Sequence, residues 1–244
     1  AGGEPTTDNT AGAGATPTAG SVKIDGSNLG SALAGSLPAK RLSANTKAGF
    51  SIVKWTGNGG SGGAQTVAHG LGQKPNMIFI KNLDDAENWV VYHDNVGFNA
   101  ITLNSTAQRI TTGASVYWND TAHDEDIFNV NTHNGVNGSV GDSDEMIAYC
   151  FTSIPGYSSF SGYEGNVDSD GIFIHLGFRP ALFIAKNYDS TGAWLMFDSA
   201  REPFNLMDLP LEADDSKAEA ASGGRELDFL SNGVKLRGNS SYLN

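Results

Sequence analysis

The sequence predicts an all-β fold: a β-sandwich or jelly-roll-like body built from two related halves, with an extended N-terminal arm. Three observations support this prediction. The chain of 244 residues contains 31 glycines and only 17% charged residues, a composition typical of short strands joined by tight turns. Its apolar residues occur in short runs between turn residues. Finally, one stretch of the chain occurs twice.

The duplicated stretch indicates the two halves. Residues 70–94 and 175–199 align without a gap at an offset of 105 residues, which places Trp89 opposite Trp194. Seven of the 25 aligned positions are identical, whereas unrelated sequences would share about one or two. A period this long indicates two related lobes and not a solenoid of short repeats. The equivalence of the two tryptophans favours core packing over sugar stacking.

The residues shared by the two copies are mostly apolar strand positions and turn residues. At the end of the aligned stretch, His93 stands opposite Asp198, and Asp94 stands opposite Ser199. Residue types that carry catalysis are therefore not duplicated. We interpret the duplicated element as a scaffold and expect no enzymatic activity.

Residues 1–48 are rich in Gly, Ala, Thr, Ser and Pro and contain few large apolar side chains. Alone, such a segment cannot offset the entropy cost of becoming ordered. We therefore expect an extended arm that lies on another subunit, with a short helical turn within Ser27–Leu37. This expectation favours a homo-oligomer or a protein that assembles with others.

Residues 49–153 are expected to form the first β repeat. Phe50–Trp55 alternates as a half-buried strand does, and the continuous apolar run Met77–Lys81 predicts a central strand. Further strands are expected at Thr66–His69, Trp89–His93, Ala100–Leu103, Val116–Trp118, Ile127–Val130 and Met146–Phe151, the last of which closes the repeat.

Residues 154–244 are expected to form the second β repeat, packed with the first as one body. Leu227–Leu230 and Val234–Arg237 flank an Asn-Gly pair, which is a strong hairpin signal. The long loop 201–222 is expected to contain a helix at Asp214–Ala221. Further strands are expected at Ile172–His175, Ala181–Lys186 and Trp194–Asp198.

The second repeat lacks a counterpart of the closing strand Met146–Phe151. At the offset of 105, this counterpart falls at about residues 251–256, beyond Asn244. We expect that the protein continues or that the second half receives this strand from elsewhere, because an open sheet edge invites pairing with another chain.

Charge and cysteine content exclude several classes of function. The net charge of −12 and the pI of about 4.6 argue against nucleic-acid binding and against anionic membranes. No apolar run reaches the roughly 18 residues needed to span a membrane, so we expect no membrane insertion. Cys150 is the single cysteine, cannot form an internal disulfide and is predicted to be a buried, inert thiol.

Two glycine motifs occur in the loop after the first strand. Residues 57–62 match G-x-G-x-x-G and residues 59–63 match G-x-S-x-G. A dinucleotide site and a nucleophile elbow both require a helix next, but a strand is expected here. We interpret the segment as a flexible hairpin loop and expect no cofactor.

The stretch Asn166, Asp168, Asp170 copies the opening of a calcium-binding EF-hand loop. The twelfth position of that loop, where Glu would chelate the ion, is Gly177. A polar hairpin turn is therefore favoured, with a Ca²⁺ site as the alternative. None of the five histidines has the spacing of zinc ligands.

Four aromatic residues are candidates for a carbohydrate-binding surface. Trp55, Trp118, Tyr117 and Tyr163 lie near predicted loops that contain Asn and Asp. A sugar ring stacks on an aromatic face while its hydroxyls bind polar partners. We therefore predict these side chains to be exposed.

Several sequence blocks occur together and in order. They are Gly49–Gly59, His69–Gly72, Trp118–Thr121, Ala148–Phe151, Gly177–Pro180 and Trp194–Arg201. Residues 46–244, which contain them, resemble a duplicated β domain of marine bacteriophage virion proteins, notably cyanophage tail-fibre and structural proteins. The resemblance implies a component of the phage particle and carries over no catalytic residue.

The resulting expectation is a non-enzymatic virion structural protein at the surface or tail of the particle, as a fibre, appendage or capsid decoration. Its expected partners are copies of itself and other virion proteins. The first alternative is a carbohydrate-binding module that attaches to a host cell-surface glycan. The second is a glycan depolymerase, which requires two carboxylates about 5–9 Å apart in a groove.

Overall fold

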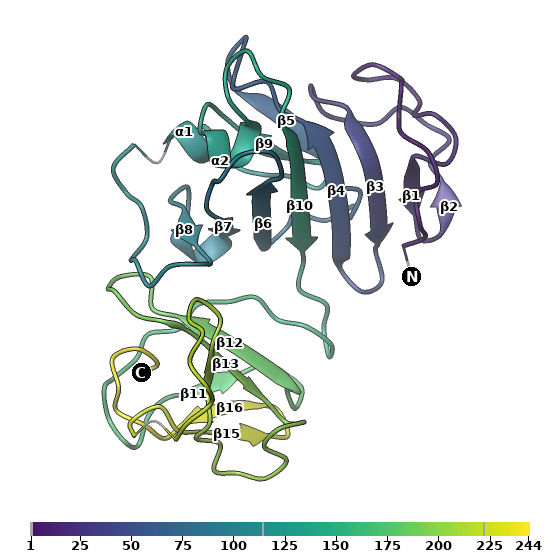
Figure 1. Cartoon of the computed structure of the whole chain (residues 1–244). Coiled ribbons are helices and arrows are strands. Elements are labelled where there is room, and N and C mark those ends of the chain that lie inside the picture. Colours follow the sequence, from purple (N-terminus) through teal and green to yellow (C-terminus); the bar gives the residue numbers. More distant parts are fainter. Residues whose placement is uncertain (1, 114, 222) are drawn as a thin grey trace. The chain divides into compact units, whose positions relative to one another are not determined.

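The computed structural model describes residues 2–113, 115–221 and 223–244 (Figure 1). The chain divides into two units. Unit 1 comprises Ala1–Ala100 and Ile110–Ile154, and unit 2 comprises Ile101–Arg109 and Pro155–Asn244. The main division after Ile154 lies one residue from the division expected from the sequence.

The fold is all-β, as predicted. The helices in the described part of the chain are one-turn elements: η1 (Asp94–Val96), α1 (Ser115–Trp118) and α2 (Asn134–Asn137). Each unit has its own apolar core between layers of β-structure.

The main sheet of unit 1 has the strand order β2-β1-β3-β4-β10-β6-β7 (Figure 1). Only β1 and β3 are paired in parallel among these strands; the other pairs are antiparallel. The strands are β1 (Val22–Ile24), β2 (Ser27–Asn28), β3 (Ala39–Asn45), β4 (Phe50–Thr56), β6 (Met77–Asn82), β7 (Val90–His93) and β10 (Glu145–Phe151).

The closing strand β10 lies in the middle of this sheet. It pairs along its length with β4 on one side and with β6 on the other. Its alternation buries Met146, Ala148 and Cys150. A strand that is last in the repeat therefore completes the centre of the sheet, and β6 is central, as predicted.

A second layer covers the inner face of the main sheet. The paired strands β5 (Gln65–Ala68) and β9 (Ile127–Val130) contribute Val67 and Phe128 to the core, together with Trp118 from α1. Trp55 of β4 meets Phe128 edge-on, with ring centroids 5.5 Å apart. The strands alternate because one face meets this core and the other faces outward.

The prediction of an arm that lies on another subunit is wrong. Most of this segment is integrated into unit 1: β3 pairs with β4, and the preceding residues bond to it, with Asn9 N donating to Lys40 O at 2.9 Å. Its sparse apolar residues, such as Val22 and Leu42, are buried because they fall on inward positions. The helical turn expected within Ser27–Leu37 is absent; β2 occupies its start.

Two further element predictions are wrong. Val116–Trp118 belongs to helix α1, because Tyr117 and Trp118 are both buried and consecutive side chains of a strand face opposite ways. The expected helix Asp214–Ala221 is absent, and the strand β14 (Leu211–Glu212) precedes turn and irregular structure there. The expected strand Ala100–Leu103 is shortened to β8 (Ile101–Thr102).

Unit 2 contains two three-stranded sheets, in the orders β11-β16-β15 and β12-β13-β14. Both contribute to one core, for example Phe197 from β13 and Phe229 from β15. The predicted hairpin is confirmed, because β15 and β16 pair across the Asn-Gly turn. The strands are β11 (Phe173–His175), β12 (Leu182–Lys186), β13 (Trp194–Asp198), β15 (Leu227–Leu230) and β16 (Gly233–Leu236).

The duplication extends to strand register. The hairpin β6–β7 of unit 1 and the hairpin β12–β13 of unit 2 pair identically at the offset of 105. The corresponding pairs include Ile78 with Tyr92 and Ile80 with Val90 in unit 1, and Phe183 with Phe197 and Ala185 with Leu195 in unit 2. The shared sequence therefore specifies one hairpin, built twice.

Candidate functional site

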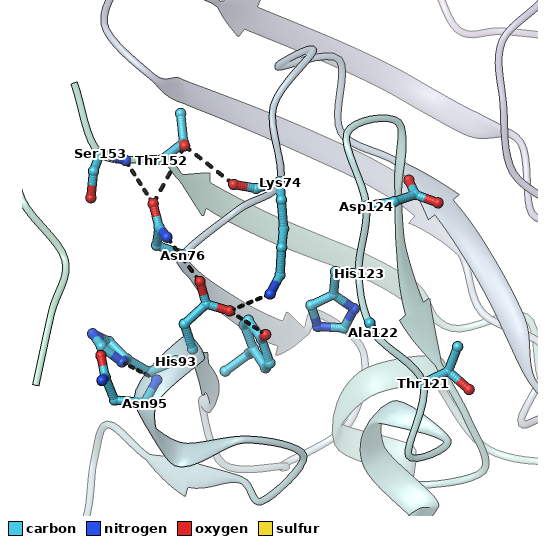
Figure 2. A network of polar contacts seen from close by, with 12 residues as sticks. Lys74, Asn76, His93, Asn95, Thr121, Ala122, His123, Asp124, Thr152 and Ser153 are labelled. Atoms are coloured by element: carbon cyan, nitrogen blue, oxygen red, sulfur yellow. Dashed lines mark hydrogen bonds and ion pairs between the residues drawn. The ribbon is translucent and has the colours of Figure 1, made fainter. Parts of the chain in front are cut away.

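A polar network surrounds the carboxylate of Asp94, the first residue of η1 directly after β7; Figure 2 labels its partners Lys74 and Asn76. Asp94 Oδ1 forms an ion pair with Lys74 Nζ at 2.7 Å and accepts a hydrogen bond from Tyr92 Oη at 2.7 Å. Its Oδ2 accepts from Asn76 Nδ2 at 2.8 Å. Tyr92 comes from β7, while Lys74 and Asn76 come from the segment that enters β6.

The same network fastens the segment that leaves β10. Asn76 Oδ1 accepts hydrogen bonds from Ser153 N at 2.8 Å and from Thr152 Oγ1 at 3.4 Å, as Figure 2 shows. Thr152 Oγ1 also lies 3.2 Å from Lys74 O. The network thus ties the start of one central strand to the end of its neighbour.

The protonation states in the network suit a structural clamp, by which we mean that the ionised Asp94 and its partners hold the start of β6 to the ends of β7 and β10. Burial alone would raise the pKa of Asp94, but the hydrogen bonds from Lys74, Tyr92 and Asn76 outweigh it and hold the pKa below its ordinary value. Burial, with the hydrogen bond to Asp94, raises the pKa of Tyr92. At neutral pH the carboxylate is ionised and the phenol is protonated, so the Asp94 carboxylate accepts protons poorly as a general base.

Two histidines near this network are core residues. His69 Nδ1 accepts from Leu71 N at 3.2 Å, so its Nε2 carries the proton that points to Asp124 O at 3.1 Å. His123 packs edge-on against Tyr92, with ring centroids 4.1 Å apart. Burial lowers the pKa of His69, and burial is also the main reason that the pKa of His123 falls to about 3. Both rings are therefore neutral.

The ends of β7 and β13 show what the duplication retained. His93 Nδ1 accepts a hydrogen bond from Asn95 N, two residues ahead, at 3.2 Å. At the equivalent position, Asp198 Oδ1 accepts from Ala200 N at 3.1 Å. The residue type differs, but the turn cap is the same. A local cap explains these side chains without any reaction chemistry.

The shared Lys-Asn pair is also a turn device. Asn82 Oδ1 accepts from the backbone N–H groups of Asp84 and Asp85, both at 2.9 Å. Asn187 Oδ1 does the same in unit 2, at 3.0 and 3.1 Å, with Asp189 and Ser190 as donors. In both units the preceding lysine Nζ donates to the asparagine carbonyl at 2.6 Å.

The predicted carbohydrate platform is wrong for three of its four residues. Trp55, Trp118 and Tyr117 are buried, so their rings offer no face to a sugar. Trp55 points inward because its neighbour Lys54 faces outward on an alternating strand. Tyr163 is partly buried, and its hydroxyl donates to Leu243 O at 2.6 Å. Tyr163 belongs to unit 2 and the other three to unit 1.

A Ca²⁺ site was the alternative for Asn166, Asp168 and Asp170. Side-chain oxygens of these three residues already form hydrogen bonds or an ion pair within the protein. Asn166 Oδ1 accepts from Asp168 N at 3.3 Å, and Asp168 Oδ1 accepts from Asp170 N at 2.9 Å. Asp170 pairs with Lys235 Nζ at 2.8 Å. No group of three His, Cys, Asp or Glu side chains suited to a metal ion occurs in the described part of the chain. The geometry favours the polar turn.

The glycine-rich loop is packed closely against α2. A Cβ on Gly57 would lie 2.3 Å from Asn137 O, and Gly57 N donates to Asp144 O at 2.8 Å. The loop leads into strand β5, as expected, but the prediction of a hairpin is wrong, because β5 pairs with β9 while β4 pairs with β3 and β10. Its first glycine is therefore required by a close approach of two backbones, a role that the sequence motif did not indicate.

An open depression of about 360 Å³ lies in unit 1, lined by Glu87, Val116, Thr132, His133 and Asn134. Glu87 is its single carboxylate among these residues, so it lacks the acid pair of a glycan hydrolase. His133 Nδ1 caps α2 by accepting from Gly135 N at 3.0 Å.

The remaining nucleophile, Cys150, is fully buried in β10. Burial raises the pKa of its thiol to about 12, which leaves it protonated and inert, as predicted. The polar and nucleophilic side chains described above therefore hold the fold together.

Within the described residues, no helix has the length and apolar character that crossing a membrane requires. No curated protein and no solved structure matches the chain. One family model does, over residues 7–244, and its description is a domain of unknown function, DUF7483. Because this match covers nearly the whole chain, the protein belongs to the DUF7483 family.

Proposed function

We propose that this chain is a non-enzymatic structural protein of a bacteriophage particle, as part of a fibre, an appendage or the capsid surface. The observation that carries the proposal is the retained architecture of the two units. Their hairpins share register and turn caps: Asn82 and Asn187 are identical, whereas the cap formed by His93 in unit 1 is formed by Asp198 in unit 2. Selection for architecture explains this pattern better than selection for a reaction centre.

The state of the polar groups supports a non-catalytic role. A general base needs a pKa near the working pH and access to its substrate. The Asp94 carboxylate is occupied by three donors, and His69 and His123 are buried and neutral. The depolymerase alternative lacks support, because the depression in unit 1 is lined by a single carboxylate.

The location on a phage particle is supported by the ordered sequence blocks described above, which resemble virion proteins. The acidic net charge of −12 suits a surface that must stay soluble and must not adhere to packaged nucleic acid. The carbohydrate-binding alternative is weakened because Trp55 and Trp118, which were predicted to be exposed, are buried.

The test uses particles of the phage that encodes the chain, purified on a density gradient. Quantitative mass spectrometry should find the chain in several copies per particle after a high-salt wash, and gold-labelled antibodies should decorate the particle surface. Absence of the chain from washed particles would contradict the virion location.

A separate assay tests the non-enzymatic part of the proposal. The purified chain is incubated with host surface polysaccharides, and newly formed reducing ends are counted. We expect no release above a heat-denatured control. Release that disappears in a Glu87→Gln or an Asp94→Asn variant, both still folded by circular dichroism, would overturn it.

A further inference from the structure

The two equivalent strands β6 and β12 differ in their pairing. In unit 1, β6 pairs with β7 on one edge and with β10 on the other. In unit 2, β12 pairs with β13 and is the outer strand of its sheet. Within the described residues of unit 2, no strand occupies the position that β10 holds in unit 1.

The free edge of β12 exposes apolar side chains. Leu182 is 53% exposed and Ile184 is 41% exposed. Their equivalents in β6, Met77 and Phe79, are partly buried. The exposed side chains therefore lie on the face of the sheet on which, in unit 1, side chains of the closing strand lie beside Met77 and Phe79.

The register in unit 1 shows what covers these positions. Met77 lies opposite Phe151, and Phe79 lies opposite Tyr149. The rings of Phe79 and Phe151 pack edge-on with centroids 5.5 Å apart. Aromatic side chains at alternate positions of the closing strand thus cover this face of the hairpin.

Within the described residues, β12 has neither a proline nor a bulge to guard its outer edge against pairing. Natural sheets guard exposed edges with charges, prolines, bulges or a covering segment. The one charged residue of β12, Lys186, is at its end, and its Nζ donates to Asn187 O at 2.6 Å and to Thr106 O at 3.4 Å, which leaves Leu182–Ala185 without a charge. The register of β12 with β13 is regular across all five residues, without a bulge.

We propose that the free edge of β12 accepts an antiparallel strand from a partner protein. This strand is an extended polypeptide segment with large apolar or aromatic side chains at the two positions opposite Leu182 and Ile184. It would complete unit 2 as β10 completes unit 1. The inference rests on the comparison of the two units and is independent of the virion location proposed above.

A second copy of this chain fits the edge less well. Its β10 is already paired on both edges. Two β12 strands paired antiparallel about Ile184 would place Leu182 opposite Lys186, so no aromatic side chain would cover the apolar positions. Self-association through β12 is therefore an outcome that would count against the proposal.

The binding experiment uses the full chain and a fluorescent peptide with the sequence of residues 144–152, in which Cys150→Ser prevents oxidation. We expect saturable binding by fluorescence anisotropy and slower amide hydrogen exchange at residues 182–186. A scrambled peptide without alternation should bind at least about tenfold more weakly. No binding, or binding without protection of β12, would overturn the proposal.

Variants locate the interaction. Ile184→Lys places a charge on the exposed edge and should weaken peptide binding at least about tenfold. Leu83→Lys changes an apolar residue of unit 1 that is 49% exposed, slightly more than Ile184, and should leave binding unchanged. Equal binding by wild type and Ile184→Lys would contradict the proposed edge.

Backbone pairing separates strand addition from apolar adhesion. Two peptides carry N-methyl groups on alternate amides, one on odd and one on even positions. Strand addition predicts that only one of them loses binding, since alternate amides of a strand face opposite edges. Equal behaviour of both peptides, or a dimer in light scattering that Ile184→Lys abolishes, would overturn the proposal.

Discussion

Unit 1 and unit 2 contain the same hairpin in two different surroundings. In unit 1 the strand β10 pairs with β6 of the hairpin β6–β7 and so covers the outer edge of β6. In unit 2 the hairpin β12–β13 ends at β12, and Leu182 and Ile184 remain exposed. Local sequence therefore determines the register and caps of the hairpin, while burial of its edge depends on a strand from elsewhere.

The largest expected effect comes from breaking the strand that distinguishes the units. Ala148 of β10 is buried between Val53 and Ile80, so Ala148→Asp places an unpaired charge in the core. We expect a loss of about 3–5 kcal/mol in the free energy of unfolding of unit 1. Tryptophan fluorescence during urea denaturation measures it, since Trp55 and Trp118 lie in the core of unit 1.

The matched control is Ala181→Asp, at an exposed position before β12. It should change the free energy of unfolding by no more than about 0.5 kcal/mol. An Ala148→Asp variant as stable as this control would show that β10 does not hold unit 1 together.

The next largest effect is expected at the two equivalent turns that Asn82 and Asn187 cap. Asn82 is buried, and its Nδ2 also donates to Asp144 Oδ2 at 3.1 Å. Asn187 is partly exposed. Because unmade hydrogen bonds cost more when buried, we expect Asn82→Ala to cost about 2–3 kcal/mol and Asn187→Ala about 1 kcal/mol. Urea denaturation of both variants measures the difference; equal costs would contradict the role of burial.

A smaller effect concerns pH. The pKa of Asp94 is lower in the folded protein than the unfolded value of about 3.9, so its contribution to stability is full above that value. This contribution is lost as the pH falls through the folded pKa. Asp94→Asn should therefore cost about 1–2 kcal/mol at pH 7 and progressively less below pH about 4.

The control for the pH effect is Ser199→Ala, at the equivalent position of unit 2. Its cost should not vary between pH 7 and pH 3, because serine does not titrate. Free energies of unfolding from urea titrations at several pH values give both curves. A cost of Asp94→Asn that stays constant with pH would contradict the ionised clamp.

The smallest effect is expected at the free edge itself. Ile184→Lys should change the stability of the chain by less than about 0.5 kcal/mol, since the side chain is already exposed. Its equivalent, Phe79→Lys, should cost about 1–2 kcal/mol, because Phe79 packs against Phe151. Thermal denaturation of the two variants measures the difference in stability. Equal losses of stability would contradict the claim that β10 covers β6 while the edge of β12 is free.

The hairpins were the most predictable part of the fold. Alternation and turn residues indicated the strands, and the repeat implied equivalent pairs that the register confirms. The N-terminal segment was not predictable in this way, because single apolar residues such as Val22 and Leu42 carry no clear period. Leu42 of β3 lies beside β4, and Val22 of β1 lies beside Leu42, so their burial depends on tertiary contacts.

The candidate site was harder to predict than the fold. The exposure predicted for Trp55 fails, although the outward Lys54 beside it indicates an inward tryptophan. The Asp94 network joins residues that lie far apart in the sequence, such as Asn76 and Ser153, so no local motif announces it. The sequence Tyr92-His93-Asp94 is the one local indication of a polar site here. Its spacing alone does not distinguish a structural network around Asp94 from a catalytic acid-base pair.

The central place of β10 has a consequence for synthesis on the ribosome. Phe50 of β4 pairs with Phe151 of β10, and about 100 residues separate the two partners. Until β10 emerges, β4 and β6 each present an unsatisfied inner edge, and such long-range pairing is slow and exposes nascent chains to aggregation. Unit 1 can therefore reach its native sheet only after its final strand has left the exit tunnel, and nascent chains stalled before residue 145 should remain protease-sensitive.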